Sequence, residues 1–113
     1  GIYGVRNAKI ELNRQTLQVE EVKFQLNQEV RKAMLNVLTA KKRRESASEW
    51  VSANQEAYRY TEERYFAEKA TVFDLQQAKY NLEKSLSELV QAKFEYIFNL
   101  KILDFYGGRK IRF

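Results

Sequence analysis

The chain has 113 residues with no Pro and no Cys, and its four Gly lie at the two ends, so Val5 to Tyr106 contains neither Gly nor Pro. Sheet-rich folds of this size need tight turns, which draw on Gly and Pro. The long stretch without either residue therefore excludes such folds. A hydrophobic content of 44% argues against disorder. The net charge of +5 comes from cations interleaved with acids, which is typical of solvated helices rather than of a nucleic-acid site. The sequence therefore predicts an all-α protein made of long helices.

The first predicted helix runs from Val5 to about Ala67 and carries two apolar stripes. One stripe repeats every seven residues, which is typical of a helix that supercoils against another helix. The other stripe lies five residues further on, about 140° around the helix, and is interrupted at Arg31. Because the stripes lie on different faces, we expect two different neighbours. The first stripe is Val5, Leu12, Val19, Leu26, Ala33, Ala40 and Ala47, and the second is Ile10, Leu17, Phe24 and Leu38.

A turn is predicted at 68–71, where Thr71 and Asp74 can form a capping box. In this motif the Thr71 hydroxyl accepts a hydrogen bond from the Asp74 amide, and the Asp74 carboxylate accepts one from the Thr71 amide. The second helix is expected over about 72–106, with Gly107-Gly108 as its stop signal. Large and small residues alternate along its seam, so that two backbones can approach closely. The seam consists of Leu75, Leu82, Leu89, Tyr96 and Leu103 with Ala78, Ser85, Ala92 and Asn99.

The two predicted helices differ in length, at ~95 Å for the first and ~50 Å for the second. Folding back at the turn gives a long antiparallel coiled-coil hairpin, in which Ala47 lies opposite Ala92 and Ala40 opposite Asn99. Residues before about Ala33 then have no partner in this chain, although the apolar stripes continue through them. An exposed apolar stripe of that length indicates an interaction surface.

Four consecutive cations, Lys41 to Arg44, allow a second organisation. They span just over one helical turn and so put charge on every face. A break there would give a three-helix bundle of about 5–42, 46–68 and 72–106. Since neither Gly nor Pro accompanies the cations, the hairpin is favoured. As a binding site the cations could take a polyanion, but we favour a solvated collar in which Glu95, opposite Arg44, supplies one countercharge.

The residue types of most catalytic and metal sites are missing from the chain. It contains no His and no Cys, which removes the commonest general base and the commonest zinc ligands. Adjacent acids such as Glu20-Glu21 and Glu62-Glu63 diverge on a helix and make poor acid–base or metal pairs. We therefore expect no enzymatic activity, no catalytic residue, no cofactor and no metal site. No apolar run reaches the ~20 residues of a membrane-spanning helix.

An ordered set of residues around the turn resembles the second coiled-coil hairpin of TolC-family outer-membrane efflux proteins. The family pattern is like Tyr-x-x-Gly-x-x-Thr-x-x-Asp-Leu-x-x-Ala, followed by Leu, Ala and Ala-x-Tyr-x-Tyr at helical spacing. The long preceding helix, with its segments 6–12 and 26–30, is similar to the family's helix that descends from the outer-membrane barrel. The resemblance thus covers nearly the whole chain. The matching residues are Arg64 to Ala78, Leu82, Leu86, Ala92-Lys93-Phe94-Glu95-Tyr96, Leu103 and Gly107.

This resemblance implies a homotrimeric parent protein in the outer membrane of a Gram-negative bacterium, whose barrel continues as a periplasmic tunnel of helices. Residues 1–113 would be a single periplasmic hairpin segment, with Gly1 to Gly4 as the end of a barrel strand and membrane contact through barrel strands outside this chain. Shorter helices stacked end to end would cover the overhang. The implied function is conduit wall and docking tip for tripartite export, with a periplasmic adaptor protein and an inner-membrane pump as partners and no nucleic acid.

The tip is the adaptor contact that the resemblance implies, and its candidate residues are Ala67, Glu68, Lys69 and Ala70. The other interpretation is that Glu68 and Lys69 are ordinary solvated turn residues. The family Gly of the turn falls on Glu68, and a residue with a Cβ disfavours a left-handed turn by ~1 kcal/mol or more. Either the turn is built differently here or Glu68 tolerates the strain.

Asp74 and Gln77 are the candidate pore constriction. The resemblance implies a carboxylate just after the turn that lines the periplasmic entrance, where three copies would form an acidic ring that favours cations. The other role of Asp74 is to cap its helix, which we favour, and the neutrality of Gln77 weakens the ring.

A second class of function also fits the sequence. The chain could be a soluble coiled-coil or three-helix interaction module that binds a protein or nucleic-acid partner through its basic collar. The parent reading frame would discriminate the two, because a channel predicts a leader peptide, flanking strands and a second, weaker copy of the hairpin.

Overall fold

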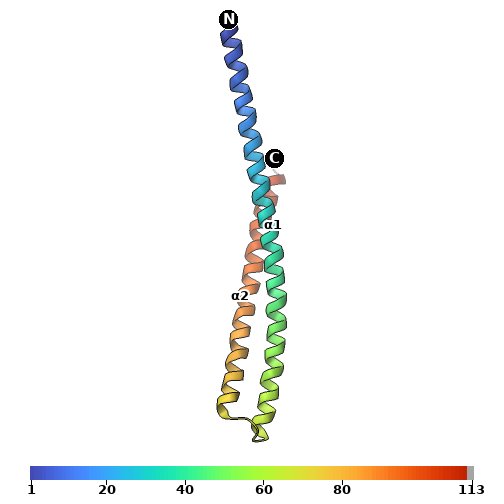
Figure 1. Ribbon diagram of the computed structural model, residues 1–113. Coiled ribbons are helices and arrows are strands. Elements are labelled where there is room, and N and C mark those ends of the chain that lie inside the picture. The colour runs from blue at the N-terminus through green and yellow to red at the C-terminus, as the bar shows by residue number, and fades with distance from the viewer. Residues whose placement is uncertain (112–113) are drawn as a thin grey trace.

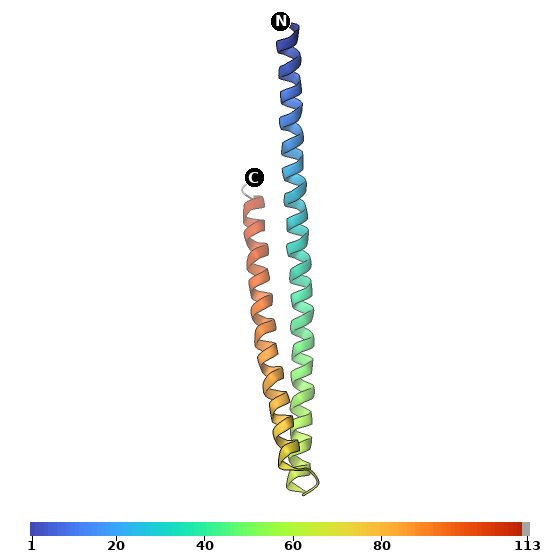
Figure 2. The same ribbon diagram turned by 60° about the vertical axis from the view of Figure 1, so that its left-hand side comes forward.

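The structure, a computed structural model, describes residues 1–111, with side chains through residue 107, and consists of two helices joined by a short turn. Helix α1 spans Ile2–Phe66 and helix α2 spans Val72–Ile111. The helices lie side by side and antiparallel, and α1 extends well beyond the end of α2 (Figures 1 and 2). The molecule measures 99 × 22 × 13 Å. The predicted all-α hairpin of one long and one shorter helix is confirmed.

Each helix extends further at one end than predicted. α1 begins at Ile2, so the strand end expected at Gly1 to Gly4 is wrong: the Gly1 carbonyl already accepts hydrogen bonds from the Gly4 and Val5 amides. A helix satisfies backbone groups within one segment, whereas a strand needs a paired neighbour. α2 passes through Gly107-Gly108 to Ile111, so the stop expected at Tyr106 is also wrong. No described glycine has a positive φ, and helical Gly weakens a helix by ~1 kcal/mol without ending it.

α1 is continuous through Lys41 to Arg44, and the three-helix alternative is therefore wrong. Two of the four cations are used in contacts with α2. Arg43 forms an ion pair with Glu95, and the Arg44 guanidinium lies over the Tyr96 ring, with its carbon 5.6 Å from the ring centroid. α1 therefore stays helical where charge alone suggested a break, and half of the charged cluster contacts α2.

The helices pack along a seam in which small side chains meet. Both predicted rows, the heptad stripe of α1 and the large–small seam of α2, supply buried residues to it. The Arg43–Glu95 pair marks the register of the two helices, and Ala47 and Ala92 line the same groove beside that pair, as predicted. Alternation of large and small residues lets the two helices interdigitate. The buried residues among those described are Ala33, Ala40, Val51 and Asn54 in α1 and Ser85 and Ala92 in α2.

A further row of α1 was not predicted and is buried or half-buried. It lies four residues after the heptad stripe, where Lys9, Thr16 and Lys23 occupy the first part of the helix. From Val30 onward, alongside α2, the row is hydrophobic except at Arg44, which is exposed. The stripe that begins at Ile10, five residues after the heptad stripe, remains exposed instead. The row comprises Val30, Val37, Val51, Tyr58 and Tyr65.

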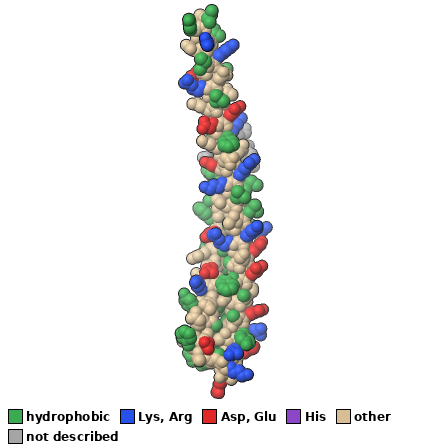
Figure 3. Space-filling view, in the orientation of Figure 1, with side chains coloured by type: hydrophobic (Ala, Val, Ile, Leu, Met, Phe, Trp, Pro, Cys, Tyr) green, Lys and Arg blue, Asp and Glu red, His purple; other side chains and the backbone are tan. Residues whose placement is uncertain are grey.

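The first part of α1 has no neighbour within the chain. Residues 1–25 are all exposed, and Val5 and Leu12 of the heptad stripe each expose 63% of their surface. Figure 3 shows hydrophobic side chains along this upper stretch, interspersed with charged ones. The predicted overhang is thus present and ends near Leu26, which is half-buried, because α2 is longer than expected. Over the described residues, neither helix has a stretch long and apolar enough to cross a membrane.

Candidate functional site

The tip of the hairpin is a hydrogen-bonded reverse turn. The Ala67 amide donates to the Glu63 carbonyl at 3.0 Å, and the Glu68 amide donates to the Tyr65 carbonyl at 3.0 Å. The Lys69 amide donates to the Arg64 carbonyl at 2.7 Å. The last two bonds are those of a Schellman motif, which places a left-handed residue just after the helix.

Glu68 is that left-handed residue, with a φ of 60°. The Schellman position is usually filled by Gly, because a Cβ in this conformation costs roughly 1–2 kcal/mol. The sequence left two options for the turn, and the structure has the one in which Glu68 tolerates the strain. The tip therefore has the backbone turn that usually contains Gly, with the charged residue Glu68 at the Gly position.

Arg64 contacts the same turn through its side chain as well as its backbone. Its Nη2 donates a hydrogen bond of 3.1 Å to the Lys69 carbonyl. The guanidinium carbon lies 5.6 Å from the centroid of the Tyr60 ring, four residues earlier on α1. Sequence reasoning missed this role, although a basic residue in the last turn of a helix is a known signal for binding the free carbonyls.

The predicted capping box at the start of α2 is confirmed. The Asp74 amide donates to the Thr71 hydroxyl at 3.1 Å, and the Thr71 amide donates to Asp74 Oδ2 at 3.0 Å. Hydrogen bonding from the Thr71 backbone, then from its side chain, lowers the pKa of the Asp74 carboxyl, and the positive charge of Arg64 acts in the same direction. Asp74 therefore stays ionised at neutral pH.

Asp74 and Gln77 lie together in one shallow groove between the helices, with a volume of about 410 Å³. Tyr60 and Arg64 line its α1 side, and Ala70 of the turn also lines it. Gln77 Nε2 donates to Asn81 Oδ1 at 3.3 Å along the groove. The structure thus brings the two candidate constriction residues onto the same side of the hairpin, next to the tip.

The surface of the tip combines charged and aromatic side chains. Ala67, Glu68 and Lys69 are exposed, and Ala70 is half-buried. Two aromatic residues flank them, and Phe66 exposes 77% and Phe73 73% of its surface. Sequence reasoning missed these aromatics as part of the tip, although both stand off the predicted seams. Figure 3 shows charges of both signs at this lower end.

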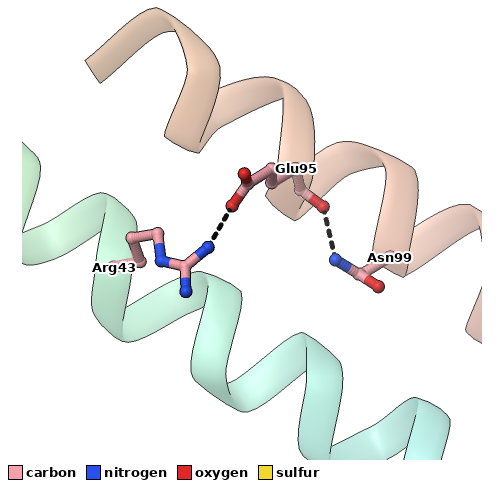
Figure 4. Close-up of polar contacts among 3 residues, drawn as sticks. All are labelled: Arg43, Glu95 and Asn99. Carbon is pink, nitrogen blue, oxygen red and sulfur yellow. Dashed lines mark hydrogen bonds and ion pairs between the residues drawn. The ribbon is translucent and has the colours of Figure 1, made fainter. Parts of the chain in front are cut away.

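Two of the four cations of the basic collar, Arg43 and Arg44, contact the second helix. Arg43 Nη1 donates to Glu95 Oε2 at 2.7 Å, and Asn99 Nδ2 donates to the Glu95 carbonyl at 2.8 Å (Figure 4). The prediction that Glu95 lies opposite Arg44 is thus wrong, because Glu95 pairs with the preceding residue, Arg43. Arg44 and Lys41 share a groove with two acids, Glu45 and Glu49. The collar therefore does not present four free cations to a polyanion.

Convergent ionisable groups are scarce elsewhere. Within residues 1–111, no three acidic side chains come together so that they could hold a metal ion. Burial, followed by the neighbouring carboxylates of Glu62 and Glu83, raises the pKa of the Tyr58 hydroxyl. Tyr58 belongs to the row that packs against α2, so this shift reflects its place in the seam.

Comparison with known proteins identifies the family. No curated protein and no solved structure matches the chain. A family model described as outer membrane efflux protein matches residues 4–108. The match includes α1 from its first turn, the tip, and α2 through residue 108. The chain belongs to the outer membrane efflux protein family.

Proposed function

We propose that this hairpin is a periplasmic tunnel segment of a TolC-like outer-membrane efflux channel. In this role it forms part of the conduit wall and carries the tip at which an adaptor docks for tripartite export. The observation that carries the proposal is the overhang, where the seam of the hairpin continues as an exposed apolar stripe. A long exposed apolar stripe is an interaction surface, and here it suits burial against further helices of a larger assembly.

The wall function rests on unpartnered faces of both helices. Burying an exposed Val or Leu contributes about 1.5–3 kcal/mol, so the overhang favours coverage by further helices. In a homotrimeric parent these would be shorter helices that stack end to end. α2 also has a second apolar row, on the side away from its seam, which suits a neighbour on the other flank. That row comprises Val90, Phe94, Ile97 and Phe98.

The docking function is assigned to Ala67, Glu68, Lys69 and Ala70. The adaptor would meet this turn, and the exposed rings of Phe66 and Phe73 would add apolar contact area beside it. Aromatic residues at an interface supply much of its binding energy. Export then proceeds without chemistry in this chain, because the inner-membrane pump supplies the energy and the tip opens when the helices shift.

The constriction function is assigned to Asp74 and Gln77. Asp74 caps α2 and also lies in the groove at the tip. Because its pKa is lowered, three copies around the entrance would form a ring that stays negative and favours cations. Gln77, one turn further on, would contribute polar but uncharged groups to the same entrance.

The docking proposal is tested in the full-length parent by replacing Glu68 and Lys69 together with Ala. We expect reduced export with an unchanged amount of folded trimer, because the tip contributes no buried residue to the core. Glu83 and Lys84 form the matched control, since they carry the same charges at exposed positions of α2, and their replacement by Ala should leave export intact. Unchanged export in the tip variant would leave the tip as an ordinary turn.

A further inference from the structure

Among the described non-glycine residues, Glu68 is the one with a positive φ, at 60°. A left-handed residue that is not Gly persists when the surrounding structure over-determines it. The two Schellman bonds contribute to this, but they form equally well around Gly and do not account for a Cβ at that position. A further contact to the turn is needed, and Arg64 supplies it.

We infer that Arg64 is the positioning residue of the tip, whose guanidinium holds Glu68 in its left-handed conformation and so sets the shape that the tip presents. The Arg64 carbonyl accepts the Lys69 amide at 2.7 Å, and Arg64 Nη2 donates to the Lys69 carbonyl at 3.1 Å. Both polar groups of the Lys69 backbone are thus bound by one residue. Glu68 directly precedes Lys69, so it cannot leave its left-handed conformation without moving the Lys69 backbone and breaking these bonds.

The position of the guanidinium is fixed by a second contact on α1. Its carbon lies 5.6 Å from the Tyr60 ring centroid, a distance at which the ring attracts a cation. A planar guanidinium can lie near an aromatic ring and still donate from its edge, whereas the ammonium of Lys is a compact point charge. Arg, rather than any cation, therefore suits this position.

Arg64 also lies close to the other end of the turn. Arg64 and Asp74 line the same groove, and the Arg64 charge helps to keep the Asp74 carboxylate ionised. Since Asp74 caps α2, the end of α1, the turn and the start of α2 are connected through Arg64. The consequence for docking rests on the proposed function, but the conformational role of Arg64 does not.

The test is a pair of substitutions in the full chain, read out by amide hydrogen exchange at Lys69, which donates the 2.7 Å Schellman bond to the Arg64 carbonyl. We expect Arg64→Gln to lower the protection of this amide about fivefold, because without the guanidinium the strained Glu68 leaves its left-handed conformation more often and breaks the Lys69 amide bond. In a Glu68→Gly background, where no Cβ strain has to be held, the same substitution should lower it less than twofold. This rescue separates positioning of Glu68 from a general loss of helix stability.

Two controls make the result specific. Arg59→Gln removes an exposed Arg that pairs with Glu63 at 3.7 Å on the same helix and should leave Lys69 protection unchanged. Arg64→Lys keeps the charge and should behave like Arg64→Gln. Equal losses in both backgrounds, no loss at all, or full protection with Lys would each overturn the inference. The docking proposal is tested separately by export, and it fails if export is unchanged when Glu68 and Lys69 are replaced. Hydrogen exchange at Lys69 still decides the role of Arg64 in that case.

Discussion

Arg43 of α1 and Glu95 of α2, 52 positions apart in sequence, form a 2.7 Å ion pair that joins the two helices. Their side chains remain 61% and 47% exposed, and exposed ion pairs contribute little to stability. We expect Arg43→Gln to lower the free energy of unfolding by only about 0.5 kcal/mol, measured by urea denaturation, with the loss shrinking at high salt. A loss above about 2 kcal/mol would contradict this, since it would mean that the pair holds the hairpin together.

Seam packing is expected to matter far more than this surface pair. Ala92 is 2% exposed and lies beside Ala47, so a larger side chain there would push the helices apart. We expect Ala92→Leu to lower the free energy of unfolding by about 1–3 kcal/mol. Ala53→Leu, at an exposed position of α1, is the control and should change it by less than about 0.5 kcal/mol. Equal effects at the two positions would show that Ala92 is not in the seam.

Glu68 stores backbone strain that Gly would relieve. Replacing it removes roughly 1–2 kcal/mol of left-handed strain, while the added freedom of the unfolded chain offsets about 0.5–1 kcal/mol. We therefore expect Glu68→Gly to raise the free energy of unfolding by about 0.5–1 kcal/mol in thermal or urea unfolding. Glu63→Gly, a control within α1 just before the tip, should instead lower the free energy of unfolding by about 1 kcal/mol. A destabilised Glu68→Gly variant would rule out a left-handed Glu68.

The Asp74 cap predicts a pH dependence of stability. The folded-state pKa of Asp74 is lowered from its ordinary value of 3.8, chiefly by hydrogen bonding from the Thr71 backbone. Its stabilising effect is therefore complete above pH 3.8 and is lost as the pH falls through the lower, folded-state pKa. We expect this acid loss to disappear in Asp74→Asn when the two proteins are unfolded with urea along a pH series.

Thr71→Ala provides the companion measurement. It removes the hydroxyl bond but keeps the backbone amide, which is the larger cause of the shift. The Asp74 pKa, followed by NMR, should rise toward its ordinary value without reaching it, and the lost cap should cost about 1 kcal/mol. An Asp74 pKa at its ordinary value in the unmodified chain would contradict the capping geometry.

The architecture of the hairpin could be predicted from local signals. The heptad stripe, the capping box at Thr71 and Asp74, and the lack of Gly and Pro from Val5 to Tyr106 depend only on neighbouring residues. These signals also located the overhang, and the difference in helix length gave its extent to within several residues. The helix type, the turn position and the main seam were therefore predictable from sequence.

Features set by contacts across the hairpin could not be predicted. Adjacent residues on a helix differ by about 100° in direction, so a one-residue difference in register decides whether Arg43 or Arg44 meets Glu95. The row beginning at Val30 was hidden because polar residues hold its earlier positions. Propensity alone argued against a left-handed Glu68, and the bonds from Arg64 overrule it. The aromatic surface of the tip depends on where the turn ends.

The overhang supplies the sharpest test of the wall function. Leu12 and Val19 belong to the heptad stripe but have no neighbour in this chain and are more than half exposed. We expect Leu12→Gln with Val19→Gln to leave the helicity and unfolding of the isolated hairpin unchanged. In the full-length parent the same pair should destabilise the trimer by about 3 kcal/mol or more, because each position loses a buried apolar side chain. Gln15→Ala with Gln18→Ala, on the same stretch of α1, is the matched control and should affect neither. A trimer that tolerates the double Gln variant would mean that no helix covers the overhang, and the proposal of a tunnel wall would then fail.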